Sequence, residues 1–160
     1  MAGLNKITEA VTETYTDAQR LALGNQLGEL RADLNGNIYE FVLVVDLDLV
    51  VGDVVYPAAV TGTSVTSDYT GGSGLTIRVK GVAIAAVDIS AAPYCWIQRA
   101  GVVSTLGDGS VAAGDPVIGH TTNGAADTMA AGEEHLVFGF ALAADTGSPT
   151  VFACQLTGTL

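Results

Sequence analysis

The sequence predicts an all-β protein, built as a small β-barrel or sandwich with an internal pseudo-twofold repeat and an N-terminal arm that carries a short helix. Three observations support this prediction. Glycine makes up 20 of the 160 residues and recurs between short apolar runs. Several of those runs alternate polar with apolar residues, as half-buried strands do. Two blocks about 60 residues apart repeat the same order of elements.

The composition favours a protein that hides apolar surface against a partner. Hydrophobic residues reach 49% and charged residues only 14%, against about 25% in a typical soluble domain. The net charge of −11 repels a phosphate backbone or an anionic membrane surface, so we expect no nucleic-acid and no membrane partner. Because the sequence shows neither a long apolar run nor a signal-like start, we expect no membrane span and a reduced, intracellular origin.

Residues 1–34 differ from the rest and form the predicted arm. Thr16 or Asp17 caps a short helix that runs through Leu23 and ends at Gly24, because a side-chain oxygen satisfies the first free N–H groups and glycine suits a left-handed C-cap. The apolar residues of this segment are too few for a core of its own. It is either an arm that lies on another surface or a disordered tail.

The β domain covers residues 35–160. Asn35-Gly36 marks a turn, and the segment 38–43 alternates between two faces. Asp46 and Asp48 continue the period of two and indicate a solvated strand face. In order, the further expected elements are a strand over 54–56, an exposed loop over 61–74, strands over 75–87 and 94–101, a short strand after Gly114-Asp115, a loop over 121–132 and a hairpin over 135–158.

The two halves, about 38–101 and 102–160, repeat one another. Each holds Gly-Asp-X-Val before a strand, a polar excursion, a Gly-apolar-Ala-apolar-Ala-Ala strand, a turn with proline, and a strand that ends in Gln-X-X-Gly. Neither half has enough strands to bury both of its faces, so we expect the halves to share one core. The alignment puts Cys95 and Cys154 on the buried face as small apolar residues, with a disulfide between them as the alternative.

Motifs for catalysis or metal binding are weak. His120 and His135 lie 15 residues apart without a zinc-ligand spacing, and no Gly-X-Ser-X-Gly elbow occurs. Asp46 and Asp48 fit a solvated strand better than a calcium or acid–base pair. We therefore predict no catalytic residue, no metal and no cofactor.

Tyr94 and Trp96 share one strand face, where the second half has Val151 and Ala153. Tyrosine and tryptophan concentrate at interfaces. This asymmetry indicates either a contact surface or packing beneath the N-terminal segment.

Two stretches carry a resemblance to a known family. They are YCWIQRAG, followed by AAGDPVIGHTTNGAADT, and the earlier LGNQLGELRADLNGNIYEFVLVVDLDLVVGDVV, within residues 23–143. With its aromatic strand and Gly-Asp-X-Val turns, the chain is similar to the capsid decoration, or cement, proteins of tailed bacteriophages.

The resemblance implies a structural virion protein, made in the bacterial cytoplasm, that lies on the outer surface of the capsid. It implies no enzymatic activity, and the major capsid protein and further copies of the chain, commonly in a homotrimer, as partners. We expect the arm and the aromatic strand to supply the contacts. The candidate capsid or subunit interface residues are Leu4, Ile7, Tyr15, Leu21, Leu23, Tyr94 and Trp96.

Other classes of function stay open at this point. The loops 61–74 and 121–132 suit a carbohydrate- or receptor-binding module of a head fibre or adhesin, although Tyr69 is their single aromatic residue. A lipoyl- or biotinyl-type carrier shares the Gly-Asp-X-Val turns, but Lys80 lies inside a predicted strand rather than at a hairpin tip. An enzyme is the remaining alternative.

Overall fold

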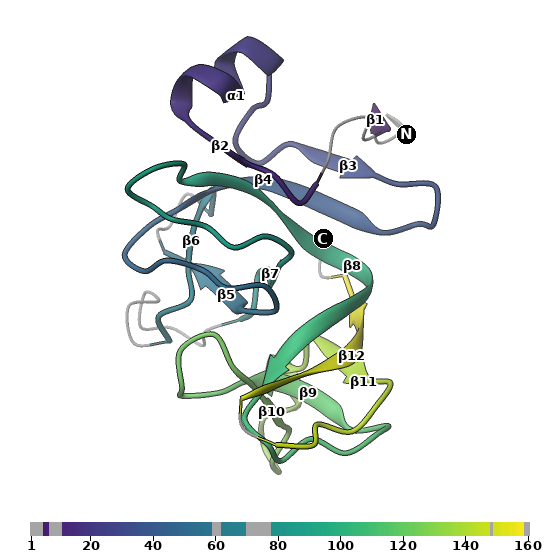
Figure 1. Cartoon of the computed structure of the whole chain (residues 1–160). Coiled ribbons are helices and arrows are strands. Elements are labelled where there is room, and N and C mark those ends of the chain that lie inside the picture. The colour runs from purple at the N-terminus through teal and green to yellow at the C-terminus, as the bar shows by residue number, and fades with distance from the viewer. Residues whose placement is uncertain (1–4, 7–10, 59–61, 70–77, 148, 159–160) are drawn as a thin grey trace.

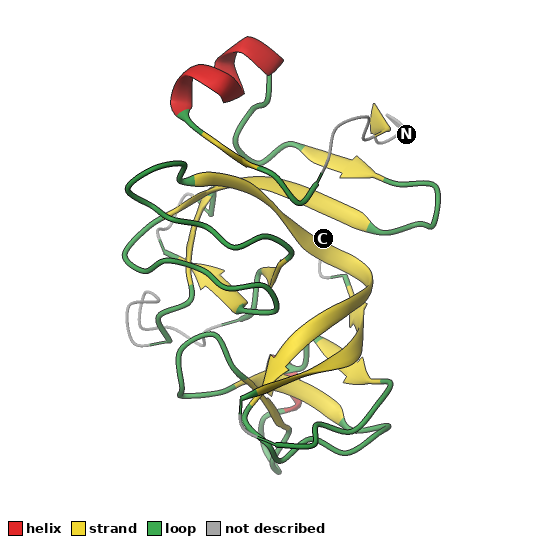
Figure 2. Cartoon of the chain, viewed as in Figure 1, coloured by secondary structure: helices red, strands yellow, loops and turns green. Residues whose placement is uncertain are grey.

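The computed structural model describes residues 5–6, 11–58, 62–69, 78–147 and 149–158. Within these ranges the chain is mostly β, with one short α-helix near the N-terminus (Figures 1 and 2). The predicted all-β class, the barrel and the short N-terminal helix are confirmed. No helix in the described part of the chain has the length and apolar character needed to cross a membrane.

The elements follow one another with short connections. In chain order they are β1 (Asn5–Lys6), β2 (Thr14–Tyr15), α1 (Asp17–Leu23), β3 (Leu30–Ala32), β4 (Ile38–Val44), β5 (Val54–Pro57), β6 (Ser64–Thr66), β7 (Gly81–Ala83), β8 (Tyr94–Gly107), β9 (Pro116–Gly119), β10 (Ala126–Thr128), the 3-10 turn η1 (Glu134–Leu136), β11 (Gly139–Ala141) and β12 (Thr150–Thr157).

The strands close two rings that share β8 (Figure 1). The first ring runs β4, β6, β5, β7, β8 and back to β4, and the second runs β8, β10, β9, β11, β12 and back to β8. In the first ring only β4 with β6 is parallel, and in the second only β8 with β10. Both rings are therefore small mixed barrels with one strand topology.

The repeat extends to single hydrogen bonds at the Gly-Asp turns. Gly52 N–H donates to Ala83 O, and Gly114 N–H donates to Ala141 O, both at 2.8 Å. Gly52 and Gly114 have φ of 98° and 93°, a conformation that side chains with a Cβ rarely adopt. The recurring glycine is thus a requirement of the turn before β5 and before β9.

Strand β8 does not end where the sequence predicts. It passes through Gly101, at φ 95°, and continues to Gly107. Its first half pairs with β4 and β7, and its second half pairs with β12. One continuous strand therefore joins the two rings.

Several further segments differ from the prediction. The loops expected over 61–74 and 121–132 contain β6 and β10, and the hairpin expected over 135–158 opens with η1. Strand β4 ends at Val44, so Asp46, at φ 71°, and Asp48 lie in an exposed turn rather than on a strand face. The strand expected over 75–87 is only β7 within the described residues, and residues 75–77 lie outside them. Strand β3, which the sequence did not indicate, pairs with β4 across the Asn35-Gly36 turn.

The core follows the two rings. Cys95 lies in the cluster inside the first ring with Ile97, and Cys154 in the cluster inside the second with Phe152. Both cysteines are buried and free, so the prediction that they act as apolar core residues is confirmed. Tyr56 of β5 joins the second cluster, and the rings therefore pack on one another.

Candidate functional site

Residues 11–34, here called the N-terminal cover, lie over the outer face of the first ring (Figure 1). Tyr15 of β2 packs on Phe41 with ring centroids 5.8 Å apart, and Phe41 packs on Trp96 at 5.1 Å. These three side chains are 3%, 0% and 0% exposed. The segment thus rests on the chain's own barrel, while the division of the chain into an arm and a β domain at residue 34 stays a prediction.

The aromatic strand face packs beneath this cover. Tyr94 stacks on Phe41 at 6.3 Å, and the guanidinium groups of Arg31 and Arg20 lie over the rings of Trp96 and Tyr94, each at 4.9 Å. Of the two readings of Tyr94 and Trp96, the structure shows packing beneath the N-terminal segment. Two candidate interface residues, Tyr15 and Trp96, are therefore interior in this conformation, because the cover excludes them from the surface.

Helix α1 forms from local signals. Gln19 N–H donates to Thr16 Oγ1 at 3.2 Å, and Thr16 N–H donates to Gln19 Oε1 at 2.8 Å, which makes a capping box. The helix ends at Leu23 with Gly24 in the left-handed C-cap. Thr16, rather than Asp17, is the N-cap, and the predicted start and end are confirmed.

Few contacts hold α1 on the barrel. Asp17 pairs with Arg20 and accepts a hydrogen bond from Tyr94 Oη at 3.2 Å, and no residue of the helix is buried. Leu21 and Leu23 are 62% and 54% exposed. Of the remaining candidate interface residues, Leu4 and Ile7 lie outside the described residues.

A second apolar surface lies on the outer side of the second ring, and sequence reasoning missed it. We call it the open face; it consists of Val102, Phe140, Leu142 and Val151, which are 46–55% exposed. Strands β8, β12 and β11 are neighbours in the sheet, so these side chains share one face. The sequence did carry a signal for this surface, because the segments FGFAL and TVFAC have apolar residues on both faces of their strands.

The first ring buries a charged group inside its barrel. Glu40 Oε1 lies 2.5 Å from Lys80 Nζ, and Glu40 Oε2 accepts from Arg99 Nη1. The side chains of Glu40 and Lys80 are 7% and 8% exposed. Burial makes each charge depend on its partner, which indicates a structural role for this group.

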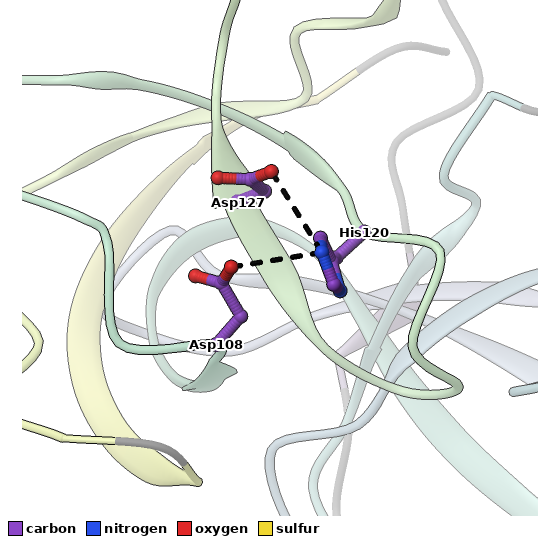
Figure 3. A group of neighbouring side chains, drawn as sticks. All are labelled: Asp108, His120 and Asp127. Carbon is purple, nitrogen blue, oxygen red and sulfur yellow. Dashed lines mark ion pairs between the residues drawn. The ribbon is translucent and has the colours of Figure 1, made fainter.

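The described residues include one group with metal-ligating side chains, formed by Asp108, His120 and Asp127 at the far end of the second ring (Figure 3). His120 Nε2 lies 3.6 Å from Asp108 Oδ2 and 4.0 Å from Asp127 Oδ2. Ser110 Oγ lies 2.7 Å from a carboxylate oxygen of each aspartate. The group joins the loops after β8 and β9 to strand β10.

The hydrogen bond on the other ring nitrogen argues against a metal at this group. Thr122 N–H donates to His120 Nδ1 at 2.9 Å. A neutral imidazole has one acceptor and one donor, so Nε2 carries the proton and points it at the carboxylates. A metal on Nε2 needs that lone pair, and metal-bound histidines normally donate from the other nitrogen to an acceptor. The group fits a polar link between loops.

The two loops considered for glycan binding contact each other. Tyr69 N–H donates to Asn123 Oδ1 at 3.1 Å. The Tyr69 ring packs edge-on against Tyr56, with centroids 5.7 Å apart. The aromatic residue that a sugar would use is thus partly occupied by an internal contact.

One comparison with known proteins is informative. No protein-family model matches the sequence, and no curated protein matches it either. Among solved structures, the chain is similar to the crystal structure of the N base of the head fiber gp8.5 of bacteriophage phi29, with a TM-score of 0.54 and 11% sequence identity. The match covers 78% of this chain and 98% of that one. At this identity the similarity is one of fold.

Proposed function

We propose that the chain is a structural protein of a bacteriophage virion that attaches to the outer surface of the head as the base of a head fibre. The observation that carries the proposal is the fold shared with a head fiber base over nearly the whole length of that base, 98%. The resemblance to capsid decoration proteins, carried by the YCWIQRAG strand, points to the same location. Neither observation calls for catalytic residues or a cofactor.

Attachment and clamping are different mechanical roles. A cement protein bridges major capsid subunits, so its interface with them must be broken before the shell ruptures. A fibre base only has to stay bound to the shell surface. In the clamping role many identical copies would act together on one shell, so modest affinity for each site suffices there, whereas each fibre base depends on its own contact. The similarity to a fibre base favours attachment, and clamping by a homotrimer is the second candidate.

Binding to empty sites tests the proposal. Labelled protein is mixed in one sample with mature heads assembled without it, and in a second sample with unexpanded procapsids. The particles in each sample are then sedimented. Saturable binding to the outer surface of mature heads, located by electron microscopy, is the expected result. No cosedimentation with mature heads at micromolar concentrations would contradict the proposal.

Two readouts separate the candidate roles. An unchanged temperature of DNA release after saturation is the expected result for a fibre base, and a raised temperature identifies a clamp. A glycan array tests the carbohydrate-binding alternative, with Tyr69→Ala as the control for signal that depends on the loops. Of the interface candidates, Leu4, Ile7, the exposed Leu21 and Leu23 and the half-buried Tyr94 stay proposals for capsid or subunit contact.

A further inference from the structure

The first ring has a surface equivalent to the open face of the second ring, and in the first ring that surface is covered. Tyr39 of β4 pairs with Gln98, and Val102 of β8 pairs with Gln155 in the same way. Tyr39 belongs to the aromatic cluster beneath the N-terminal cover and is 5% exposed, whereas Val102 is 52% exposed. One position of the repeat is thus buried in the first ring and bare in the second.

The other members of the open face follow the same rule. The counterparts of Phe140, Leu142 and Val151 are Val82, Ile84 and Tyr94. Val82 is 0% exposed, against 46% for Phe140, and it is covered by the second-ring cluster rather than by the N-terminal cover. Ile84 and Tyr94 pack against the aromatic cluster. The fold therefore uses this face as a packing surface once and leaves its second copy without a cover from the described residues.

The open face continues a surface that already binds a segment of this kind. Along β8, Tyr94 and Trp96 point outward beneath the N-terminal cover, and Val102 and Ser104 point outward on the open face. The outer side of one strand thus runs from the covered region to the bare one. The occupant that this continuity suggests is part of the N-terminal cover of another copy. That cover lies on its own first ring, and the part of it that stays exposed is α1.

The exposed side of α1 has the matching character. Ala18, Leu21 and Ala22 are all exposed, and their spacing puts them on one helix face. Asp17 pairs with Arg20, so the helix adds almost no net charge. The outward residues of the open face are also free of ionisable groups, in a chain of net charge −11. Two such copies repel one another except where both surfaces lack carboxylates.

We propose that α1 of one copy docks on the open face of the next copy, so that Leu21 packs among Val102, Phe140 and Val151. Helix α1 and the strands of the open face lie at opposite ends of the molecule (Figure 1), so the contact is heterologous, and its repetition gives a closed ring or an open filament according to the rotation between copies. This inference deepens the proposed function and rests on it for the role of Leu21 as a candidate subunit contact, but the contact itself forms in solution without a phage head. Its failure would leave the head-binding experiment unaffected.

Complementation tests the contact. The helix variant is Ala18→Gln with Leu21→Gln, and the sheet variant is Phe140→Gln with Val151→Gln. Light scattering should show an oligomer for the wild type and monomers for each variant alone. An equimolar mixture of the two variants should give a two-chain complex and nothing larger, because only one intact contact remains.

A control variant outside both surfaces accompanies this test. Leu34→Gln changes a side chain that is 84% exposed and belongs to neither surface, so it should assemble like the wild type. A monomeric wild type at millimolar concentration would overturn the proposal, and so would a helix variant that assembles normally. If the sheet variant does not fold, chains with Leu21→Cys and with Val102→Cys are mixed and oxidised. An interchain disulfide is expected, and none when Leu34→Cys replaces Leu21→Cys.

Discussion

Asp53 and Asp115 close the same turn in the two rings. Asp53 Oδ2 accepts from Val50 N–H at 2.9 Å, and Asp115 Oδ2 accepts from Ala112 N–H at 3.0 Å. Their surroundings differ, because Asp53 is 5% exposed and lies against the loop between β9 and β10, whereas Asp115 is more exposed. The same Gly-Asp turn thus has a buried carboxylate in the first ring and a more exposed one in the second.

We predict that Asp53 makes the protein less stable as the pH rises. Burial raises the pKa of Asp53 from 3.8 to about 6, although the Val50 hydrogen bond opposes the shift. The folded chain then binds this proton more tightly than the unfolded chain, so the free energy of unfolding falls between pH 4 and 6 and stays lower above. Asp53→Asn should raise the free energy of unfolding by about 1–3 kcal/mol at pH 7.5 and leave it unchanged at pH 4, as measured by urea unfolding.

The matched control for this change is Asp115→Asn, which alters the same turn in the second ring. It reports what the exchange of a carboxylate for an amide does to the turn hydrogen bond itself. An equal pH dependence of unfolding in the wild type and in Asp53→Asn would contradict the prediction.

We predict that the buried charges of the first ring can be exchanged for the apolar residues of the second. The counterparts of Glu40, Lys80 and Arg99 are Val103, Phe138 and Leu156. Glu40→Val alone leaves two cations without their carboxylate and should cost about 3–5 kcal/mol. The triple exchange to Val, Phe and Leu should restore stability to within about 1 kcal/mol of the wild type.

Guanidinium unfolding of the single and triple variants measures both effects. The comparison depends on the coupling between the three positions rather than on any one substitution. If the triple variant were as unstable as Glu40→Val, the two rings would differ in shape at this position and not only in chemistry.

We predict that two equivalent glycines are needed for close strand packing. A Cβ on Gly81 would lie 2.6 Å from Gln98 O, and a Cβ on Gly139 would lie 2.7 Å from Gln155 O. Gly81→Ala and Gly139→Ala should therefore each cost about 1–3 kcal/mol. Gly147→Ala is the control, because its Cβ would make an ordinary 3.6 Å contact with Thr150 Cγ2. Melting temperatures that are unchanged in the first two variants would refute this reading.

We predict that both thiols are inert in the folded protein. Burial raises the pKa of Cys95 to about 12 and that of Cys154 to about 11, so on the order of 0.1% or less is thiolate at pH 8. A colorimetric disulfide reagent should label neither thiol in buffer and both in denaturant. Rapid labelling of the native protein would show that one ring opens readily.

Local sequence determined the parts of the structure that depend on neighbouring residues. The helix from Thr16 to Gly24 formed as predicted because its caps lie within one turn of the residues they satisfy. The Gly-Asp turns before β5 and β9 followed from glycine's access to positive φ. The repeated pattern of apolar positions was sufficient to place Cys95 and Cys154 in the core.

The candidate site could be predicted only in part. Leu21 and Leu23 were recognised as apolar residues on a segment without a core, and both are exposed. Trp96 was recognised as unusual, but its burial depends on Tyr15, which is 81 positions earlier in the chain. The open face was missed, because an apolar residue on a strand signals a buried position unless the packing partner of each face is known.

The sequence by itself determined that this chain is a repeated β structure with a capped N-terminal helix, since hydrogen bonds and apolar periodicity between near neighbours carry that information. Only the tertiary structure decided that β8 runs through both halves, that the N-terminal cover seals the first ring and that the matching face of the second ring stays bare. The physical reason is that strand pairing and side-chain burial join residues far apart in the chain, and the same apolar pattern is compatible with a covered face and with an open one.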